Sequence, residues 1–224
     1  MFRDAIGWKA VDVNPCRELK RLHEPSRDRY VDDAEFAAVY ALASPVLQCM
    51  MDLATITGQR EGDLLRLPNR DPKVYTDAGV VFRPGKSRRK HPRHGRVIVT
   101  SKTVVVEWSE ELRAVVDRAR ALCGRDIRPT LICTRDAEAY TESGFRSNWH
   151  RLMTKATATE DADGNKIAPK LAEPFTFHDL RAKSATGDDL EEAHERLAHD
   201  DMRTTQTIYR RKPRRARAGR KVGS

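Results

Sequence analysis

The chain has 224 residues, 39% of them hydrophobic and 33% charged, with a formal net charge of +9 at pH 7. This length can bury one sizeable core, and the composition is that of a globular protein with a polar surface. No apolar run approaches the roughly 18 residues of a membrane span, and Arg3, Asp4 and Lys9 replace the apolar core of a signal peptide. The composition thus argues against a membrane or exported protein.

The positive charge is concentrated in two segments. Residues 83–96 contain seven Lys or Arg and no acid, and residues 210–224 contain eight and no acid. Without these fifteen, 27 basic residues remain against 33 acidic ones, a net charge of −6. Local basicity of this kind suits a polyanionic backbone such as that of DNA, although residues 212–224 could also be a solvated tail.

The four cysteines, at positions 16, 49, 123 and 133, show no Cys-x-x-Cys spacing. This spread argues against a zinc site or a disulfide framework. Cys133 lies in the apolar run 131–133 and is expected to be a core residue.

The first half of the chain predicts helices and then strands. A short helical pattern in the first eight residues breaks at Asn14-Pro15, and a helix is expected after Asp32 or Asp33. The next helix is expected over residues 45–56. Three β-branched or aromatic runs, over residues 80–82, 97–99 and 104–106, predict a small antiparallel sheet around a basic turn region.

The segment directly after the predicted third helix is Thr57-Gly58-Gln59-Arg60, in which an arginine lies two residues after a glycine. The glycine permits a close turn, so that Arg60 would enter a site from the start of a helix. Asp63, one turn along, would orient Arg60 or brace the neighbouring loop.

The second half of the chain is mainly helical. One helix is expected from Ser109, another after Thr141 or Ser143, and residues 157–169 read as an exposed loop. His91 and His94 have no further metal ligands at a suitable spacing, so two solvated histidines in the basic segment are expected. The predicted class is α+β, mainly α-helical with a small antiparallel β-sheet.

The stretch 175–211 contains four residues suited to phosphate chemistry: His178, Arg181, His199 and Tyr209. A guanidinium can bind two phosphate oxygens, an imidazole exchanges a proton near neutral pH, and a phenol can act as an oxygen nucleophile. A helical domain with unrelated histidines and a core tyrosine is the alternative interpretation.

Three motifs of this stretch resemble the tyrosine recombinases, the phage integrase family: Phe-Thr-Phe-His-Asp-Leu-Arg, Leu-Ala-His and Thr-Thr-Gln-Thr-Ile-Tyr. The Thr-Gly-x-Arg box around Arg60 is similar to that family's first catalytic-arginine box. The resemblance covers residues 27–211 and implies the family's DNA breaking-rejoining catalytic fold. It also implies a site-specific recombinase, or integrase, of a phage or other mobile element, which cleaves and rejoins DNA through a 3′-phosphotyrosyl intermediate.

The resemblance gives each matched residue a role. Arg60 and Arg181 would neutralise the pentacoordinate phosphate, with His199 as a further donor to a non-bridging oxygen. His178 would accept the proton of Tyr209.

A family lysine on a β-hairpin protonates the departing 5′ oxygen, and two lysines match its context. Lys86 follows the first predicted strand in Gly-Lys-Ser, and Lys102 precedes the last one in Ser-Lys-Thr. Lys86 is favoured because it preserves the order of strand and then lysine, whereas the insertion 87–96 keeps Lys102 as the alternative.

The resemblance also implies an organisation and partners. Residues 1–26 would be a remnant of a core-binding domain's last helix plus a linker, 27–209 the catalytic domain, and 210–224 a basic tail. The expected partner is double-stranded DNA at attachment sites, with a tetramer on two duplexes, accessory DNA-bending proteins and no cofactor. We expect the protein in the cytoplasm of a bacterial or phage host cell, at the nucleoid. The predicted DNA-binding residues are Arg83, Arg88, Arg89, Lys90, Arg210 and Arg211.

Two other functions remain open from the sequence. One is an integrase remnant that binds DNA without recombining it, since the rest of the clamp domain is not seen. The other is a nicking-closing enzyme similar to type IB topoisomerases, which shares the chemistry.

Overall fold

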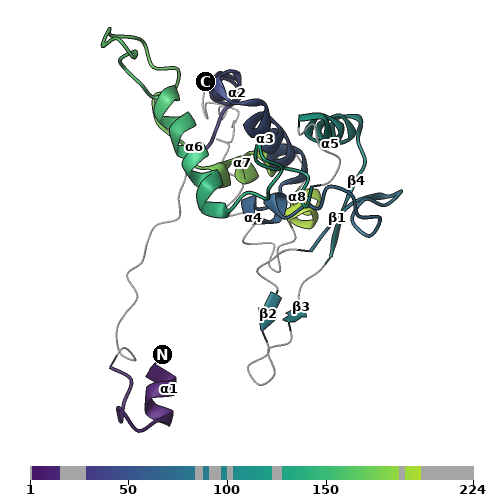
Figure 1. Cartoon of the computed structure of the whole chain (residues 1–224), viewed down its shortest axis with the longest axis vertical. Coiled ribbons are helices and arrows are strands. Elements are labelled where there is room, and N and C mark those ends of the chain that lie inside the picture. The colour runs from purple at the N-terminus through teal and green to yellow at the C-terminus, as the bar shows by residue number, and fades with distance from the viewer. Residues whose placement is uncertain are drawn as a thin grey trace, which may run out of the picture.

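The computed structural model describes residues 2–15, 29–83, 88–90, 97–99, 103–122, 128–186 and 190–197. Its elements in chain order are the helices α1 (Phe2–Gly7), α2 (Asp33–Leu42), α3 (Pro45–Thr57) and α4 (Glu61–Leu65), the strands β1 (Gly79–Phe82), β2 (Arg88–Lys90), β3 (Val97–Val99) and β4 (Val104–Glu107), and the helices α5 (Glu110–Leu122), α6 (Glu142–Ala156), α7 (Phe177–Ser184) and α8 (Leu190–Leu197). Helices form the body of the domain, and the strands lie at one end of it (Figure 1). None of the helices described is long and apolar enough to cross a membrane.

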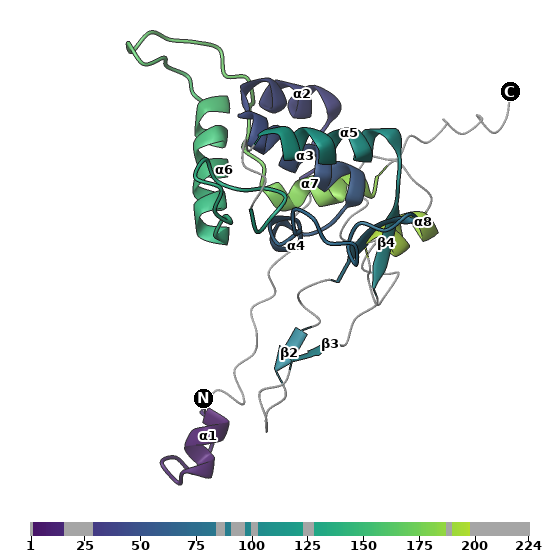
Figure 2. The ribbon, with the colours of Figure 1, turned by 45° about the vertical axis from the view of Figure 1, so that its right-hand side comes forward.

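Helix α3 is the centre of the core. Ser44 caps its N-terminus, Pro45 occupies the first turn, and seven of its residues are buried. It packs against α5 on one side and α7 on the other, and α2 packs against α6 (Figure 2). Helix α3, which precedes the Arg60 box, is therefore fixed by its packing against α5 and α7.

Local sequence explains where the helices begin. Asp32 caps α2 through a reciprocal pair of bonds with Glu35, and the Thr141 hydroxyl accepts from the Gly144 amide at the start of α6. The predicted helices after Asp32, from Pro45, from Ser109 and after Thr141 are thus confirmed. So is the short helix at the start of the chain.

The strands form two antiparallel ladders. β1 pairs with β4, with Phe82 opposite Val104, and β2 pairs with β3, with Arg88 opposite Val99. The three apolar runs form antiparallel strands as predicted, but they belong to two two-stranded sheets and not to one, and residues 88–90, expected in a turn, form a strand. Three consecutive cations show no strand pattern, and their pairing with the apolar run 97–99 provides the order that the sequence does not reveal.

Aromatic rings close the core between α6 and α7. The ring of Phe145 meets that of Phe177 edge-on at 5.0 Å between centroids, and Trp149 meets Phe177 at 5.2 Å. The indole of Trp149 also donates to the Phe175 carbonyl at 3.1 Å. These contacts fix the start of α7, the helix that carries His178 and Arg181.

The chain enters the domain along α7. The ammonium of Lys183 donates to the Val31 carbonyl at 3.2 Å and pairs with the Asp33 carboxylate at 2.5 Å. Arg29 pairs with Glu35 and donates to the Glu173 carbonyl at 3.2 Å. The segment from residue 29 onward is therefore an integral part of the domain.

Candidate active site

Arg60 lies at the first turn of α4. It is the N-cap residue, with extended φ and ψ of −72° and 150°, and its carbonyl accepts from the amides of Asp63 and Leu64. Its side chain is partly exposed. Arg60 thus lies at the start of a helix, as predicted, whereas its entry into a catalytic site stays a prediction.

The turn before Arg60 requires glycine. Gly58 has a φ of +64°, and its amide donates to the Ala54 carbonyl at 3.0 Å to end α3. A Cβ here would lie 3.0 Å from the Ser184 hydroxyl of α7 and 3.0 Å from a Leu197 methyl of α8. The Arg60 box is thus in close contact with the two helices that carry or precede the other candidate residues.

His178 and Arg181 lie one turn apart at the start of α7. The Asp179 carboxylate accepts from both the amide and the hydroxyl of Thr176, which anchors the first turn. His178 is exposed, whereas Arg181 is 1% exposed. His178 therefore lies at the surface of the domain, whereas the Arg181 guanidinium lies inside it.

The Arg181 guanidinium joins three segments of the chain. One terminal nitrogen donates to the carbonyl of Gly58, and the other donates to the carbonyl of Leu197 at the end of α8. Because the side chain is covered, direct contact with a phosphate requires a local movement of the residues around it. The catalytic role of Arg181 stays a prediction, and the structure adds a structural role to it.

Gln59 connects the loop before Arg60 to α8 through a hydrogen bond. Its side-chain amide nitrogen donates to the Arg196 carbonyl at 2.7 Å and to the Thr57 carbonyl at 3.2 Å, and the residue is 1% exposed. In the sequence, the one signal for this role is the position of Gln59 inside the Thr-Gly-x-Arg box.

Helix α8 packs on α7 through small side chains. Ala193 and Leu197 form a buried cluster with Ala182 and Ala185. His199 follows two residues after Leu197 in the sequence and lies outside the described residues, as do Lys86, Lys102, Tyr209, Arg210 and Arg211.

The two candidate lysines belong to linkers between the same two ladders. Residues 83–87 connect β1 to β2, and residues 100–103 connect β3 back to β4. Both lysines therefore stay candidates. Of the predicted DNA-binding residues, Arg83 follows β1 with an exposed side chain, and Arg88, Arg89 and Lys90 form β2.

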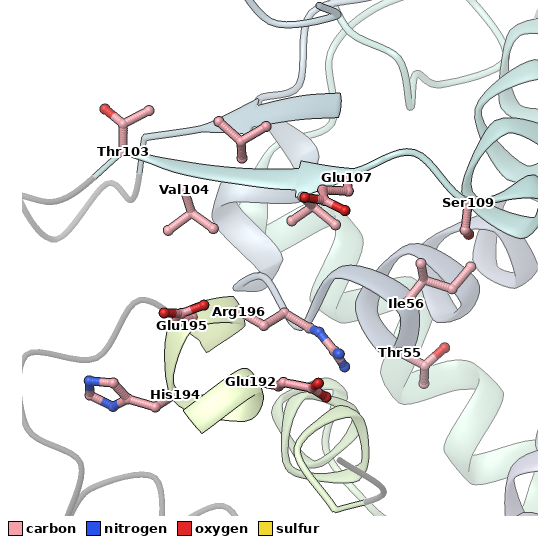
Figure 3. Close-up of a pocket in the computed structure, with 12 residues that line it drawn as sticks. Thr55, Ile56, Thr103, Val104, Glu107, Ser109, Glu192, His194, Glu195 and Arg196 are labelled. Atoms are coloured by element: carbon pink, nitrogen blue, oxygen red, sulfur yellow. The ribbon is translucent and has the colours of Figure 1, made fainter. Parts of the chain in front are cut away.

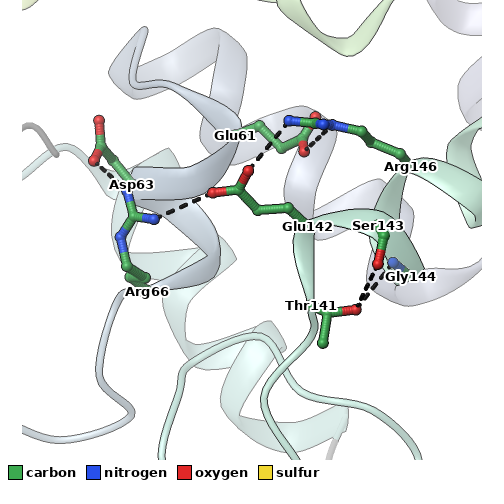
Figure 4. A network of polar contacts seen from close by, with 8 residues as sticks. All are labelled: Glu61, Asp63, Arg66, Thr141, Glu142, Ser143, Gly144 and Arg146. Atoms are coloured by element: carbon green, nitrogen blue, oxygen red, sulfur yellow. Dashed lines mark hydrogen bonds and ion pairs between the residues drawn. The ribbon is translucent and has the colours of Figure 1, made fainter. Parts of the chain in front are cut away.

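Asp63 takes part in an ion-pair network between α4 and α6 (Figure 4). Arg66 joins the carboxylates of Asp63 at 2.9 Å and Glu142 at 3.3 Å, and Arg146 joins those of Glu142 at 3.2 Å and Glu61 at 3.2 Å. Burial raises the pKa of Glu61, and the nearby Arg146 partly offsets this. The network connects α4 to α6, whereas the expected roles of Asp63, orienting Arg60 or bracing the neighbouring loop, stay predictions.

A cavity of about 870 Å³ lies between β4, the end of α3 and α8 (Figure 3). Glu107, Glu192 and Glu195 contribute three carboxylates to its lining, and Arg196 and His194 are its basic residues. The acidic lining makes this cavity a poor site for a phosphate.

The exposed face of α6 carries cationic residues that the sequence analysis missed. They are Arg146, Arg151 and Lys155, and the exposed His150 lies beside them. Their spacing of five and four residues, opposite the buried Phe145 and Trp149, was the available signal. Among the residues that the structure describes, no group of three or more His, Cys, Asp or Glu side chains could hold a metal ion.

Comparison with known proteins identifies the family. The model of the phage integrase family matches residues 31–215. The integrase of Enterobacteria phage 434 is 25% identical over 187 residues, which cover 82% of this chain and 46% of that protein.

Solved structures agree. A lambda integrase dimer bound to a COC′ core site superposes with a TM-score of 0.61 at 20% identity, over 98% of this chain and 59% of the other. A lambda integrase tetramer bound to a Holliday junction gives a TM-score of 0.62 at 20% identity, over 97% and 58%. The chain thus spans less than two thirds of each of these proteins. It belongs to the phage integrase family and has the catalytic fold of tyrosine recombinases.

Proposed function

We propose that this protein is a site-specific DNA recombinase, an integrase of a phage or other mobile element, that works through a 3′-phosphotyrosyl intermediate. The observation that supports it most is the junction at Gly58 and Leu197. There the loop of Arg60, the helix of His178 and Arg181, and the end of the helix before His199 meet through the Arg181 guanidinium. Segments that are far apart in the sequence, and that carry or precede residues suited to phosphate chemistry, thereby meet at one place.

The proposed cleavage step is a transesterification. The free phenol of a tyrosine has a pKa of about 10 and is mostly protonated at neutral pH, so Tyr209 needs a base. The exposed His178 takes that proton as the Tyr209 oxygen attacks the phosphorus. The bond to the 5′ oxygen breaks, and Lys86, or Lys102 in its place, supplies the proton to that oxygen.

Three further groups stabilise the charge of the transition state. Arg60, Arg181 and His199 are the proposed donors to the non-bridging oxygens. Religation is the reverse reaction, in which a 5′ hydroxyl attacks the phosphotyrosine. The energy of the broken bond is kept in the protein–DNA ester, so the cycle requires no cofactor.

The proposed partner is double-stranded DNA at attachment sites. The basic residues of β2, the exposed Arg83, the cationic face of α6, and Arg210 and Arg211 supply charge for its phosphates. By analogy with the lambda integrase tetramer on a Holliday junction, the proposed assembly is a tetramer on two duplexes, with accessory DNA-bending proteins. The proposed location is the nucleoid in the cytoplasm of a bacterial or phage host cell.

The proposed organisation is a catalytic domain over residues 27–209 and a basic segment over 210–224. The bonds of Arg29 to the Glu173 carbonyl and of Lys183 to the Val31 carbonyl support the inclusion of residues from 29 onward in the catalytic domain. Residues 1–26 would then belong to a linker and the last helix of a core-binding domain.

The test is a search for a covalent adduct. The full chain is incubated with nicked duplexes that tile the DNA flanking its gene, and adducts that resist SDS are counted. Wild type and a Tyr30→Phe control should form adducts on the same duplexes, whereas Tyr209→Phe should form none and bind DNA as before. Tyr30→Phe is the matched control because it also removes a tyrosine hydroxyl, but from the segment by which the chain enters the domain. There the Tyr30 ring lies beside Lys183.

Each alternative function predicts another result. A DNA-binding remnant gives salt-sensitive binding and no adduct with any variant, which would overturn the enzymatic proposal. A nicking-closing enzyme gives the Tyr209-dependent adduct and relaxes supercoiled plasmid, but yields no recombinant joints between two duplexes.

A further inference from the structure

We propose that Glu142 is a positioning residue for Arg60, a role that rests on the function proposed above. Glu142 is the first residue of α6, and its carboxylate pairs with two arginines that also pair with the first turn of α4. That turn begins at Arg60. Glu142 would act through the position of Arg60, without touching DNA.

Helix α4 is too short to keep its position by itself. It has five residues, and helices of this length are not stable on their own in water. The carbonyl of its N-cap residue, Arg60, accepts hydrogen bonds from the amides of Asp63 at 2.9 Å and Leu64 at 3.0 Å. The direction in which the Arg60 side chain leaves this turn therefore depends on the neighbours to which α4 is attached.

Both carboxylates in the first turn of α4 are connected to Glu142 (Figure 4). Arg66 lies 2.9 Å from the Asp63 carboxylate and 3.3 Å from one oxygen of Glu142. Arg146 lies 3.2 Å from the Glu61 carboxylate and 3.2 Å from the other oxygen of Glu142. Without Glu142 the network divides into two ion pairs, of which only the pair of Glu61 with Arg146 still connects the two helices.

Gly62 shows that the Glu142 carboxylate lies directly on α4. A Cβ at position 62 would lie 2.7 Å from the Glu142 oxygen that pairs with Arg66, and 3.1 Å and 3.2 Å from the two terminal nitrogens of Arg66. A loose ion pair at the surface contributes little, because it must hold two long side chains in one geometry. Here the glycine lets the carboxylate and the guanidinium rest against the backbone of α4, so the network sets the spacing of α4 and α6.

The first experiment compares Glu142→Ala with Asp52→Asn. Asp52 is a matched control, because its carboxylate also joins side chains of two other helices, Tyr40 of α2 at 2.8 Å and Arg118 of α5. At saturating nicked duplex, Glu142→Ala should form the adduct about 10-fold more slowly, with a Kd for DNA no more than about twofold above wild type. Asp52→Asn should keep the wild-type rate. A wild-type rate in folded Glu142→Ala would overturn the proposal.

A variant at Gly62 separates positioning from loss of stability. The methyl group of Gly62→Ala would displace the Glu142 carboxylate, which is the far end of a flexible side chain. Alanine is favoured over glycine inside a helix, so this variant should unfold at the same urea concentration as wild type or at a higher one. It should nevertheless form the adduct more slowly than wild type. A wild-type rate would contradict the positioning role.

A double-mutant cycle shows whether the two changes act through the same contact. In a Glu142→Ala background, Gly62→Ala should have little further effect on the rate, since the carboxylate that the methyl group displaces is already gone. If Gly62→Ala caused the same loss in both backgrounds, its effect would not depend on Glu142, and the proposal would fail.

A further readout does not depend on catalysis. The amide of Leu64 donates to the Arg60 carbonyl, so its exchange with deuterated solvent reports how often the first turn of α4 opens. In the free protein this amide should exchange several-fold faster in Glu142→Ala than in wild type, and at the wild-type rate in Asp52→Asn. Unchanged exchange in Glu142→Ala would refute the role. This readout holds even if wild type forms no adduct, a result that would count against the proposed function alone.

A variant that fails to fold is recognised by its circular dichroism melting curve. In that case Glu142→Gln replaces Glu142→Ala, since its amide keeps the size of the side chain but has one acceptor oxygen for two arginines. It should form the adduct more slowly than wild type and exchange the Leu64 amide faster. Wild-type values of both in folded Glu142→Gln would overturn the proposal.

Discussion

At the scale of single residues, the molecule uses Arg181 in an unexpected way. A side chain suited to phosphate is 1% exposed, and its guanidinium donates to the carbonyls of Gly58 and Leu197. Its position in a His-x-x-Arg motif is evident from the sequence. Its burial is not, because the two carbonyls lie 123 and 16 residues away and reach it only in the folded domain.

Replacement of Arg181 should therefore lower stability as well as activity. Arg181→Lys keeps the charge but loses the planar fork, so a buried carbonyl is left without its donor. We expect the free energy of unfolding in urea to fall by about 2–3 kcal/mol. Arg146→Lys, at a side chain that is 66% exposed, should change it by less than about 0.5 kcal/mol. A stability of Arg181→Lys equal to wild type would contradict the structural role.

The general acid can be assigned with a modified substrate. A 5′-bridging phosphorothiolate releases a thiolate, which needs no proton to leave. The Lys86→Ala variant should cleave the ordinary ester about 10²- to 10⁴-fold more slowly than wild type does. It should cleave the phosphorothiolate at nearly the wild-type rate. Lys102→Ala should show no such recovery, and recovery by Lys102→Ala alone would make Lys102 the acid.

Among the helices and strands, the sequence predicts the features that depend on neighbouring residues but not those that depend on distant ones. The caps Asp32, Ser44 and Thr141 act within three residues, so the starts of their helices follow from the sequence. Strand β2 is a run of three cations whose order depends on pairing with residues 97–99. The bond from Gln59 to α8 is equally non-local, which is why the arginine box alone did not reveal it.

Gly58 shows how one backbone position joins two elements. Gly58 and Gly164 both have positive φ, but a Cβ at Gly164 would meet nothing within 4 Å. Gly164→Ala should therefore cost only the backbone strain, about 1 kcal/mol, whereas Gly58→Ala should cost about 2–4 kcal/mol because α7 and α8 must also move. Urea unfolding of both variants checks this, and equal losses would show that the close approach of α8 contributes nothing.

At the scale of the whole molecule, the charge distribution points to DNA. Outside the two basic segments the sequence is net acidic, the exposed face of α6 carries basic side chains, and three carboxylates line the cavity between β4 and α8. Binding should therefore use particular surfaces and not net charge alone. The two basic segments could be predicted from the sequence, whereas the acidic cavity depends on the packing of α8 beside β4.

The salt dependence of DNA binding measures how much the basic surfaces contribute to the affinity. The logarithm of the affinity should fall steeply with the logarithm of salt concentration, by about 0.9 for each phosphate neutralised. Replacing Arg88, Arg89 and Lys90 together by alanine should reduce that slope by about 2–3. Replacing Arg113, Arg118 and Arg135 by alanine should leave the slope unchanged. If this replacement reduced the slope equally, β2 would have no special part in binding.

In the proposed reaction, Tyr209 becomes covalently joined to the 3′ end of a cleaved strand. Mass spectrometry of the adduct after digestion with protease and nuclease can identify this bond. One modified peptide is expected, with a nucleotide linked through its 3′ phosphate to the phenolic oxygen of Tyr209. A nucleotide on another residue, or one linked through its 5′ phosphate, would contradict it.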